Sequence, residues 1–270
     1  MSSSNSEQLV EVESSKLGTK EHWDECYDRE INCFNDTGDV GEIWFGETCL
    51  KKMCKDIANI KDISKDAAIL DIGCGNGYTL VELSQLGFTN LHGSDYSAKA
   101  IDLSKQIAES ESIDINYFVD DIRNSIIKEN SYDVVVDKGT FDAMALSEER
   151  DQAKFDYKTT VSKILKSGGY FIITSCNYTN AELQQYFTSN TDTTLHSNYT
   201  FSHNVQYPVF KFGGSQGQSQ TTCSHNRIVF LSIPPKTLCR VVADITNIIY
   251  VDISYSDNPI HPHRFINVVS

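Results

Sequence analysis

Between residues 67 and 187, short apolar runs alternate with longer stretches of helical period. The short runs predict strands over residues 67–72, 90–94, 115–119, 132–137 and 169–174. Helices are expected over residues 77–86, 98–110, 151–165 and 181–187. Short buried strands that alternate with helices are typical of parallel βαβ units. We therefore expect an α/β fold with a mostly parallel sheet and helices on both faces.

The segments that flank this alternation follow other patterns. Thr19 is a candidate N-cap for a helix over residues 20–34, and a second amphipathic helix is expected over residues 48–60. Residues 205–212 and 221–231 have strand patterns joined by residues 213–217, which predicts a C-terminal antiparallel hairpin at the sheet edge. Residues 1–15 are polar and expected to be a disordered tail. The domain is then expected over residues 16–231, with residues 232–270 as an extension without a clear period.

Composition narrows the class of partner. The 37 acidic and 23 basic residues give a net charge of −14, which argues against nucleic acid or a membrane as partner and allows a basic protein. The eight cysteines form no Cys-x-x-Cys pair and no zinc spacing, so we expect reduced thiols and no metal. The chain has no targeting pattern at its start and no apolar run of about 18 residues. We therefore expect a cytoplasmic protein that acts as a monomer.

Residues 70–77 read Leu-Asp-Ile-Gly-Cys-Gly-Asn-Gly and follow the first predicted strand. A glycine-lined turn there lets the backbone approach a nucleotide-like ligand, although a plain tight turn is the alternative. Asp95 ends the second strand, where an acid accepts hydrogen bonds from ribose hydroxyls in dinucleotide enzymes as well. The glycine spacing separates the two classes, because a dinucleotide site would need its third glycine at Tyr78 rather than at Gly77. Asp71 before the first glycine also suits a ligand with ammonium and sulfonium groups, which favours S-adenosylmethionine.

Two further acidic runs follow predicted strands. Asp121 can accept from an adenine amino group while Ile122 lies against the ring, and a helix N-cap is the alternative for Asp121. Asp137 ends the fourth strand, where substrate meets cofactor in open sheets, and is the candidate to orient the acceptor nitrogen; a capping aspartate is the alternative. No Asn-Pro-Pro-Tyr run occurs there, which disfavours methylation of nucleic-acid bases. The candidate cofactor-binding residues are Asp71, Gly73, Gly75, Asn76, Gly77, Asp95, Tyr96, Asp121, Ile122 and Asp137.

Several other runs occur together and in order. They are residues 16–24 (Lys-Leu-Gly-Thr-Lys-x-x-Trp-Asp), 41–46 (Gly-Glu-Ile-Trp-Phe-Gly), 137–143 (Asp-Lys-Gly-Thr-Phe-Asp-Ala), 173–177 (Ile-Thr-Ser-Cys-Asn) and 212–214 (Phe-Gly-Gly). With them, residues 16–231 resemble the seven-strand lysine methyltransferases that modify translation elongation factor 1-alpha, the yeast-type enzyme and its metazoan methyltransferase-like relative. The resemblance implies a Rossmann-like class I fold, the cofactor S-adenosylmethionine, and cytoplasmic mono- and dimethylation of one lysine. Members have also been linked to intracellular transport.

The end of the chain departs from this family. His225, Asn226 and Arg227 interrupt the last strand, and 39 residues follow Leu231, which indicates a lineage-specific tail or a mispredicted gene end.

Aromatic walls suit methylation of a lysine, because they shelter its stem and tolerate its cationic head. The candidates are Trp44, Phe45, Phe141 and Tyr178, with Asn177 and Asp137 as polar guides. Each aromatic also fits a plain core position; the Trp44–Phe45 pair fits it least, because it follows a glycine outside the sheet. A methyltransferase of small molecules or RNA, a catalytically inactive scaffold and a nicotinamide-dependent oxidoreductase are the alternatives.

Overall fold

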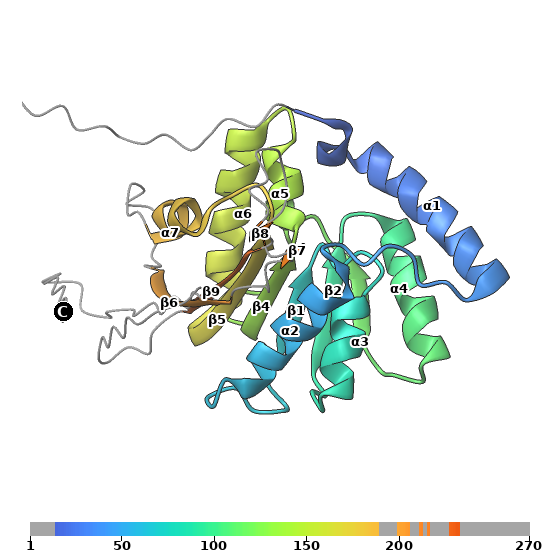
Figure 1. Ribbon diagram of the computed structural model, residues 1–270, viewed down its shortest axis with the longest axis horizontal. Helices are drawn as coiled ribbons and strands as arrows, with labels where there is room; N and C mark the ends of the chain where they lie inside the picture. Colours follow the sequence, from blue (N-terminus) through green and yellow to red (C-terminus); the bar gives the residue numbers. More distant parts are fainter. Residues whose placement is uncertain (1–13, 189–198, 206–210, 213–214, 217–226, 233–270) are drawn as a thin grey trace, which may run out of the picture.

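The computed structural model describes residues 14–188, 199–205, 211–212, 215–216 and 227–232. A seven-stranded sheet lies at its centre, with helices on both faces (Figure 1). In sheet order the strands are β3 (Asn116–Val119), β2 (Leu91–Asp95), β1 (Ile69–Ile72), β4 (Tyr132–Lys138), β5 (Leu165–Ser175), β9 (Arg227–Ser232) and β6 (Thr200–Val205). The first five pair in parallel, whereas β9 is antiparallel to both β5 and β6. This is the α/β arrangement in which ligands bind at the carboxyl ends of parallel strands.

Side chains alternate between two cores, one on each face of the sheet. The helices are α1 (Lys20–Thr37), α2 (Gly46–Asn59), α3 (Tyr78–Gln85), α4 (Ala98–Ser110), α5 (Thr140–Ala145), α6 (Arg150–Ile164) and α7 (Asn180–Thr188). Ile69 and Val136 pack into the core that α2, α3 and α4 cover. Ile72 and Val135 pack into the opposite core with α5, α6 and α7. None of the described helices combines the length and apolar character needed to cross a bilayer.

Helix α1 lies on the outside of α4 (Figure 1). Thr19 caps it, as the sequence predicts, because its Oγ1 accepts a hydrogen bond from the amide of His22 at 3.4 Å. Its apolar face is only partly buried, and Ile31 packs there against Leu103 and Ile107 of α4. A short 3-10 turn, η1 (Lys16–Gly18), precedes α1, and Ser15 beside it donates a backbone hydrogen bond to Leu146 after α5. The helix is thus held at its start and along its length.

The structure confirms the five parallel strands and the helices between them, and α4 has the predicted bounds. β5 begins at Leu165, earlier than predicted, because α6 passes directly into it. The six-residue α5 was not predicted, since its residues were assigned to the site. A second 3-10 turn, η2 (Ile122–Asn124), follows β3.

The predicted C-terminal strands differ from those observed. The structure places a strand at Thr200–Val205, where the polar Thr-Phe-Ser-His-Asn-Val sequence hides the alternation. Residues 206–210 of the strand predicted over 205–212 lie outside the described residues. Two-residue strands β7 (Lys211–Phe212) and β8 (Ser215–Gln216) pair with each other, so the predicted connection contains a strand. The rest of the predicted hairpin, the predicted tail and nearly all of the predicted extension lie outside the described residues.

Candidate active site

The glycine loop follows β1 and begins α3. Gly73, Gly75 and Gly77 have φ angles of 60°, 56° and 75°, which non-glycine residues rarely adopt. A Cβ on Gly73 would lie 2.1 Å from Thr140 Oγ1, and one on Gly75 would lie 2.6 Å from the Tyr27 hydroxyl. The sequence argument assigned these glycines to close approach of a ligand. In the structure, backbone conformation and contact with neighbouring side chains already require glycine.

A cavity that is partly open to solvent lies beside this loop at the carboxyl ends of the strands. Seven of the candidate cofactor-binding residues line it: Gly73, Gly75, Asn76, Asp95, Tyr96, Asp121 and Ile122. Trp44 lines it as well, from the loop before α2. Residues from α1, β4 and α5 that the sequence argument did not place in the site complete the wall: Trp23, Tyr27, Lys138, Thr140, Ala143 and Met144.

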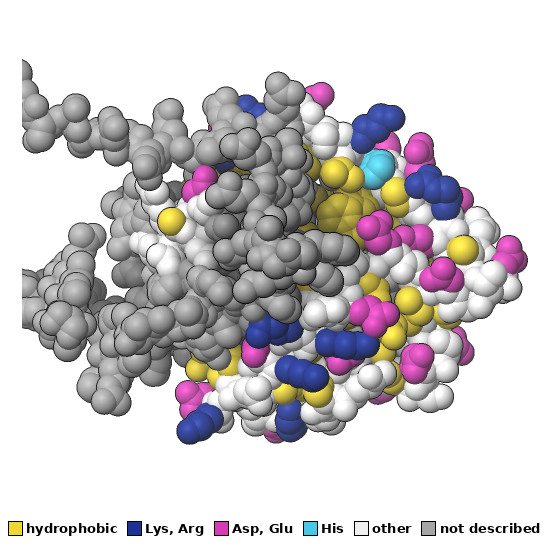
Figure 2. Space-filling view, in the orientation of Figure 1, with side chains coloured by type: hydrophobic (Ala, Val, Ile, Leu, Met, Phe, Trp, Pro, Cys, Tyr) yellow, Lys and Arg dark blue, Asp and Glu magenta, His cyan; other side chains and the backbone are white. Residues whose placement is uncertain are grey.

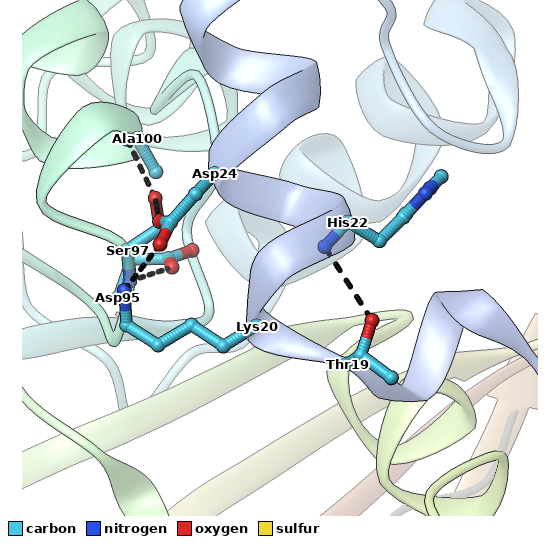
Figure 3. Close-up of polar contacts among 7 residues, drawn as sticks. All are labelled: Thr19, Lys20, His22, Asp24, Asp95, Ser97 and Ala100. Atoms are coloured by element: carbon cyan, nitrogen blue, oxygen red, sulfur yellow. Dashed lines mark hydrogen bonds and ion pairs between the residues drawn. The ribbon is translucent and has the colours of Figure 1, made fainter.

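Asp95 is a buried acid of the cavity wall, and Figure 3 shows it beside Ser97. Its Oδ2 accepts from the amide of Gly75 at 3.0 Å, and its Oδ1 accepts from the amide of Ser97 at 2.9 Å. Burial raises the pKa of Asp95 to about 6, against the opposing effect of these two amide hydrogen bonds. A carboxylate has about four acceptor positions, so two remain for donors in the cavity.

Helix α1 contacts the same turn. The Ser97 hydroxyl donates to Asp24 Oδ1 at 2.5 Å, and Lys20 lies 2.6 Å from the other oxygen of Asp24 (Figure 3). Ser97 also caps α4, because its Oγ accepts from the amide of Ala100 at 3.3 Å. One buried serine therefore connects α1, α4 and Asp95.

Two acids follow β3. Asp121 is exposed and caps η2 by accepting from the amide of Arg123 at 3.0 Å, and it also lines the cavity. Asp120 is buried in the same wall, and its Oδ1 accepts from the amide of Ile126 at 3.0 Å. Its Oδ2 is buried without a hydrogen-bond partner among the described residues. Sequence reasoning chose Asp121 alone and missed Asp120, although the two are adjacent.

Asp71 lies beneath the loop and does not line the cavity. Only 1% of its surface is exposed, and neither carboxylate oxygen has a hydrogen-bond partner in the described part of the chain. Burial raises the pKa of Asp71 to about 7, although the nearby charge of Lys138 acts in the opposite direction.

Asp137 points away from the cavity, to the side of α5 and α6. Its carboxylate accepts from the amides of Thr140 at 2.8 Å and Phe141 at 2.9 Å, and from the Tyr157 hydroxyl. Burial raises the pKa of Asp137 to about 7, while the hydrogen bond from Tyr157 lowers it. The structure thus gives Asp137 the capping geometry of its alternative interpretation, and its neighbour Lys138 faces the cavity.

The aromatic candidates divide into two groups. Trp44 lines the cavity with Trp23, their ring centroids 5.2 Å apart, and Phe45 packs against Trp44 at 6.1 Å. Phe141 and Tyr178 belong to the buried core on the opposite face of the sheet, with 1% and 5% of their surfaces exposed. Of the four aromatic candidates the structure therefore brings only Trp44 to the cavity, and Phe45 packs against it.

Two polar candidates outside the strands, Asn177 and Asn76, donate hydrogen bonds to backbone carbonyls. The Asn177 side chain donates to the Asp142 carbonyl at 3.4 Å and does not line the cavity. The Asn76 side chain donates to the carbonyls of Val40 at 3.0 Å and Glu42 at 3.3 Å, so it ties the glycine loop to the loop that carries Trp44. Gly77 also lies behind the wall, where a Cβ would meet the Tyr117 hydroxyl at 2.4 Å.

Sequence reasoning missed the contribution of α1 to the cavity. Trp23 and Tyr27 are one helical turn apart and their rings stack at 6.0 Å, and both line the cavity. Their spacing of four residues, which places both rings on one face of a helix, is the signal that the sequence carries. Figure 2 shows a hollow with hydrophobic side chains and with acidic side chains beside it. Among the described residues, no group of His, Cys, Asp and Glu side chains could hold a metal ion.

The fold and sequence match known methyltransferases. Residues 63–220 match the family described as a methyltransferase domain. A chain from the complex of the Haloferax volcanii Trm112 methyltransferase activator with a methyltransferase has a TM-score of 0.50 and 13% identity. That match covers 77% of this chain and 96% of the other, and it supports the fold.

Curated relatives give a narrower family. EEF1A lysine methyltransferase 2 from Danio rerio is 44% identical, over 77% of this chain and 86% of its own length. The Homo sapiens protein of the same name is 41% identical over 76% and 84%. Protein-lysine N-methyltransferase EFM4 from Saccharomyces cerevisiae is 38% identical over 80% and 95%. With the glycine loop, Asp95 and the aromatic wall in one cavity, this chain belongs to the EEF1A lysine methyltransferase family.

Proposed function

We propose that this chain transfers methyl groups from S-adenosylmethionine to a lysine of translation elongation factor 1-alpha. The relatives named for EEF1A, and the yeast protein-lysine methyltransferase, match at least 76% of the chain. The observation that carries the proposal is the composition of the cavity. The glycine loop and Asp95 form one side, and the pair of Trp23 and Trp44 contributes aromatic surface to the same wall. A nucleotide-like cofactor and an aliphatic side chain with a cationic end would meet there.

The acceptors of the wall fit the donors of this cofactor. Asp95 has acceptor positions left for ribose hydroxyls, and the unpartnered Oδ2 of Asp120 suits an adenine amino group. Asp121 and Ile122 lie in the same stretch of wall, and Asp71 contributes negative charge from beneath it. When bound, S-adenosylmethionine supplies a methyl group on a positively charged sulfur. The proposed cofactor-binding residues are Gly73, Gly75, Asn76, Asp95, Tyr96, Asp120, Asp121 and Ile122, with Asp71 and Gly77 supporting the wall from behind.

The aromatic side chains act on the lysine. A free lysine has a pKa of about 10.4, so removing its proton at neutral pH costs roughly 4–5 kcal/mol. Half-buried Trp23 and Trp44 exclude water from the lysine stem, and low polarity around an ammonium lowers its pKa. Holding the neutral nitrogen in line with the methyl group then requires alignment rather than a strong base. No described carboxylate needs to serve as a general base in this scheme.

Four predicted catalytic residues act from behind the wall. Asp137 holds the first turn of α5, which carries Phe141 into the core. Asn177 and Tyr178 belong to the turn after β5, which Asp142 fixes through the amide of Cys176 at 2.7 Å. Their contribution is to position the cavity wall, while Trp44 provides aromatic surface with Trp23, and Phe45 supports Trp44.

The same proposal extends to the setting of the reaction. The net charge of −14 favours a basic protein over nucleic acid or an anionic membrane as the partner. We propose mono- and dimethylation of one lysine by a cytoplasmic monomer, with residues 16–231 as the methyltransferase domain and a C-terminal antiparallel hairpin in its sheet.

The test is methyl transfer from labelled S-adenosylmethionine to purified elongation factor 1-alpha, followed by mass spectrometry of its lysines. We expect label on one lysine of the factor with the wild-type chain, and less than a hundredth of that with Asp95→Ala. The exposed Asp114→Ala is the matched control and keeps full activity. Label confined to RNA or small molecules in a cytosolic extract would contradict the proposed substrate.

A further inference from the structure

The cavity wall carries more acidic than basic side chains. Four acids line it, namely Glu42, Asp95, Asp120 and Asp121, whereas Lys138 is the one Lys or Arg among the described lining residues. Lys138 is half-buried, and a partly desolvated ammonium is costly to leave without a hydrogen-bond partner. Its position therefore calls for a ligand or a partner of opposite charge.

Strand register places Lys138 above Asp71. Asp71 of β1 pairs with Val136 of β4, and Lys138 follows two residues later, so all three side chains lie on the face that α2 and α3 cover. Because β4 alternates, this register sends Asp137 to the opposite face, where Tyr157 meets it. Lys138 is thus the one ionisable side chain at the end of β4 that faces the cavity.

Neither of the two opposite charges has a close partner. Neither oxygen of the buried Asp71 has a partner with full hydrogen-bond geometry, although the Thr79 hydroxyl lies close enough to lower the pKa of Asp71. The Lys138 side chain makes no hydrogen bond or ion pair within the described segments. They act on each other only over a longer distance, since the charge of Lys138 lowers the pKa that burial raises at Asp71. Asp71 therefore stabilises an ammonium at the end of β4 without occupying its donors, which remain available to the cavity.

We propose that Lys138 binds the α-carboxylate at the methionyl end of the cofactor, and that Asp71 is a positioning residue that acts through Lys138. This inference rests on the proposed function, because it assumes S-adenosylmethionine in this cavity. The carboxylate is the only anionic group of that cofactor, and Lys138 is the only cation that the described wall offers to it. A charged hydrogen bond of this kind corresponds to about a 10- to 100-fold effect on affinity.

The test compares three ligands by isothermal titration, without turnover. S-adenosylhomocysteine carries the carboxylate and the amine, its decarboxylated analogue keeps only the amine, and 5′-methylthioadenosine lacks both. We expect Lys138→Gln to weaken binding of S-adenosylhomocysteine about 10- to 100-fold and binding of the other two less than 2-fold. Lys138→Arg should restore most of the loss. Lys51→Gln is the matched control, because Lys51 is an exposed lysine of α2 paired with Glu47 at 2.7 Å, and it should change none of the three.

Asp71→Asn tests the positioning role, and it should reduce the preference for S-adenosylhomocysteine over the decarboxylated analogue less than Lys138→Gln does. Equal losses for all three ligands in Lys138→Gln would overturn the inference. If Lys138→Gln does not fold, the wild type alone tests the inference. A wild-type preference of less than 2-fold for S-adenosylhomocysteine over the decarboxylated analogue would also overturn the inference. A wild type that binds none of the three would overturn the proposed function together with this inference, whereas binding with an unchanged preference in Lys138→Gln overturns the inference alone.

Discussion

At the end of β4, the two faces of the sheet differ in whether their buried polar side chains have hydrogen-bond partners. On the α5–α6 face, the Asp137 carboxylate accepts from two amides and a tyrosine hydroxyl within an aromatic core. On the α2–α3 face, the Asp71 oxygens have no partner, and Lys138 faces the cavity. Buried polar groups in folded proteins are nearly always paired, so the incomplete pairing beside the cavity supports the ligand site that we propose on that face. We therefore expect Asp137 to contribute to stability and the other face to contribute to binding.

The largest loss of stability should come from removing the hydrogen-bonded carboxylate of Asp137. Asp137→Ala leaves the amides of Thr140 and Phe141 and the Tyr157 hydroxyl without their acceptor, at about 1–3 kcal/mol for each buried group. We expect the free energy of unfolding to fall by roughly 3–6 kcal/mol, measured by urea denaturation. Tyr157→Phe removes one of the three hydrogen bonds and should cost about 1 kcal/mol. If Asp137→Ala instead kept its stability and lost only kcat, Asp137 would have the acceptor-orienting role that the sequence first suggested.

Next in size is the loss of Asp95. Its carboxylate holds Gly75 and Ser97 in place and offers its remaining acceptor positions to the cavity. We expect Asp95→Ala to weaken S-adenosylhomocysteine binding at least 100-fold, which corresponds to about 3 kcal/mol. Isothermal titration against Asp114→Ala provides the comparison. An Asp95→Ala variant that kept its affinity would remove Asp95 from the cofactor site.

The effect of Asp71→Asn on the stability of the fold should change sign between acidic and alkaline pH. A carboxyl whose pKa is raised from 3.8 to about 7 in the folded state keeps its proton there while the unfolded chain has lost it. The wild type therefore loses stability as pH rises from about 4 to about 7, by at most about 4 kcal/mol. The asparagine variant avoids this loss but buries an amide without partners, at about 1–3 kcal/mol. We expect Asp71→Asn to have the lower Tm at pH 4.5 and the higher Tm at pH 8. The same Tm difference at both values would contradict a raised pKa at Asp71.

The sequence predicted the sheet, the helices around it and most of the cofactor wall, because these depend on local periodicity and on residues next to strand ends. It chose Asp137 over Lys138 because both end the same strand, and only the packing of α5 and α6 shows which of the two faces the cavity. It missed Trp23 and Tyr27 because their place in the wall depends on how α1 docks against α4. Pairings between distant segments decided each of these cases.

The smallest expected effect concerns the connection between α1 and Asp95. Asp24 accepts from the Ser97 hydroxyl at 2.5 Å, and Ser97 holds Asp95 through its amide at 2.9 Å. Asp28, one turn later on α1, pairs with Lys99 of α4 at 2.7 Å and is exposed, so it ties the same two helices without touching Ser97. We expect Asp24→Ala to weaken cofactor binding about 3- to 5-fold, or less than about 1 kcal/mol, and to increase hydrogen exchange in α1. Asp28→Ala should change affinity less than 2-fold, since exposed ion pairs contribute little. Equal effects of the two substitutions would mean that α1 acts only as a tether, and a larger effect of Asp24→Ala would show that α1 takes part in holding the acid of the cofactor site.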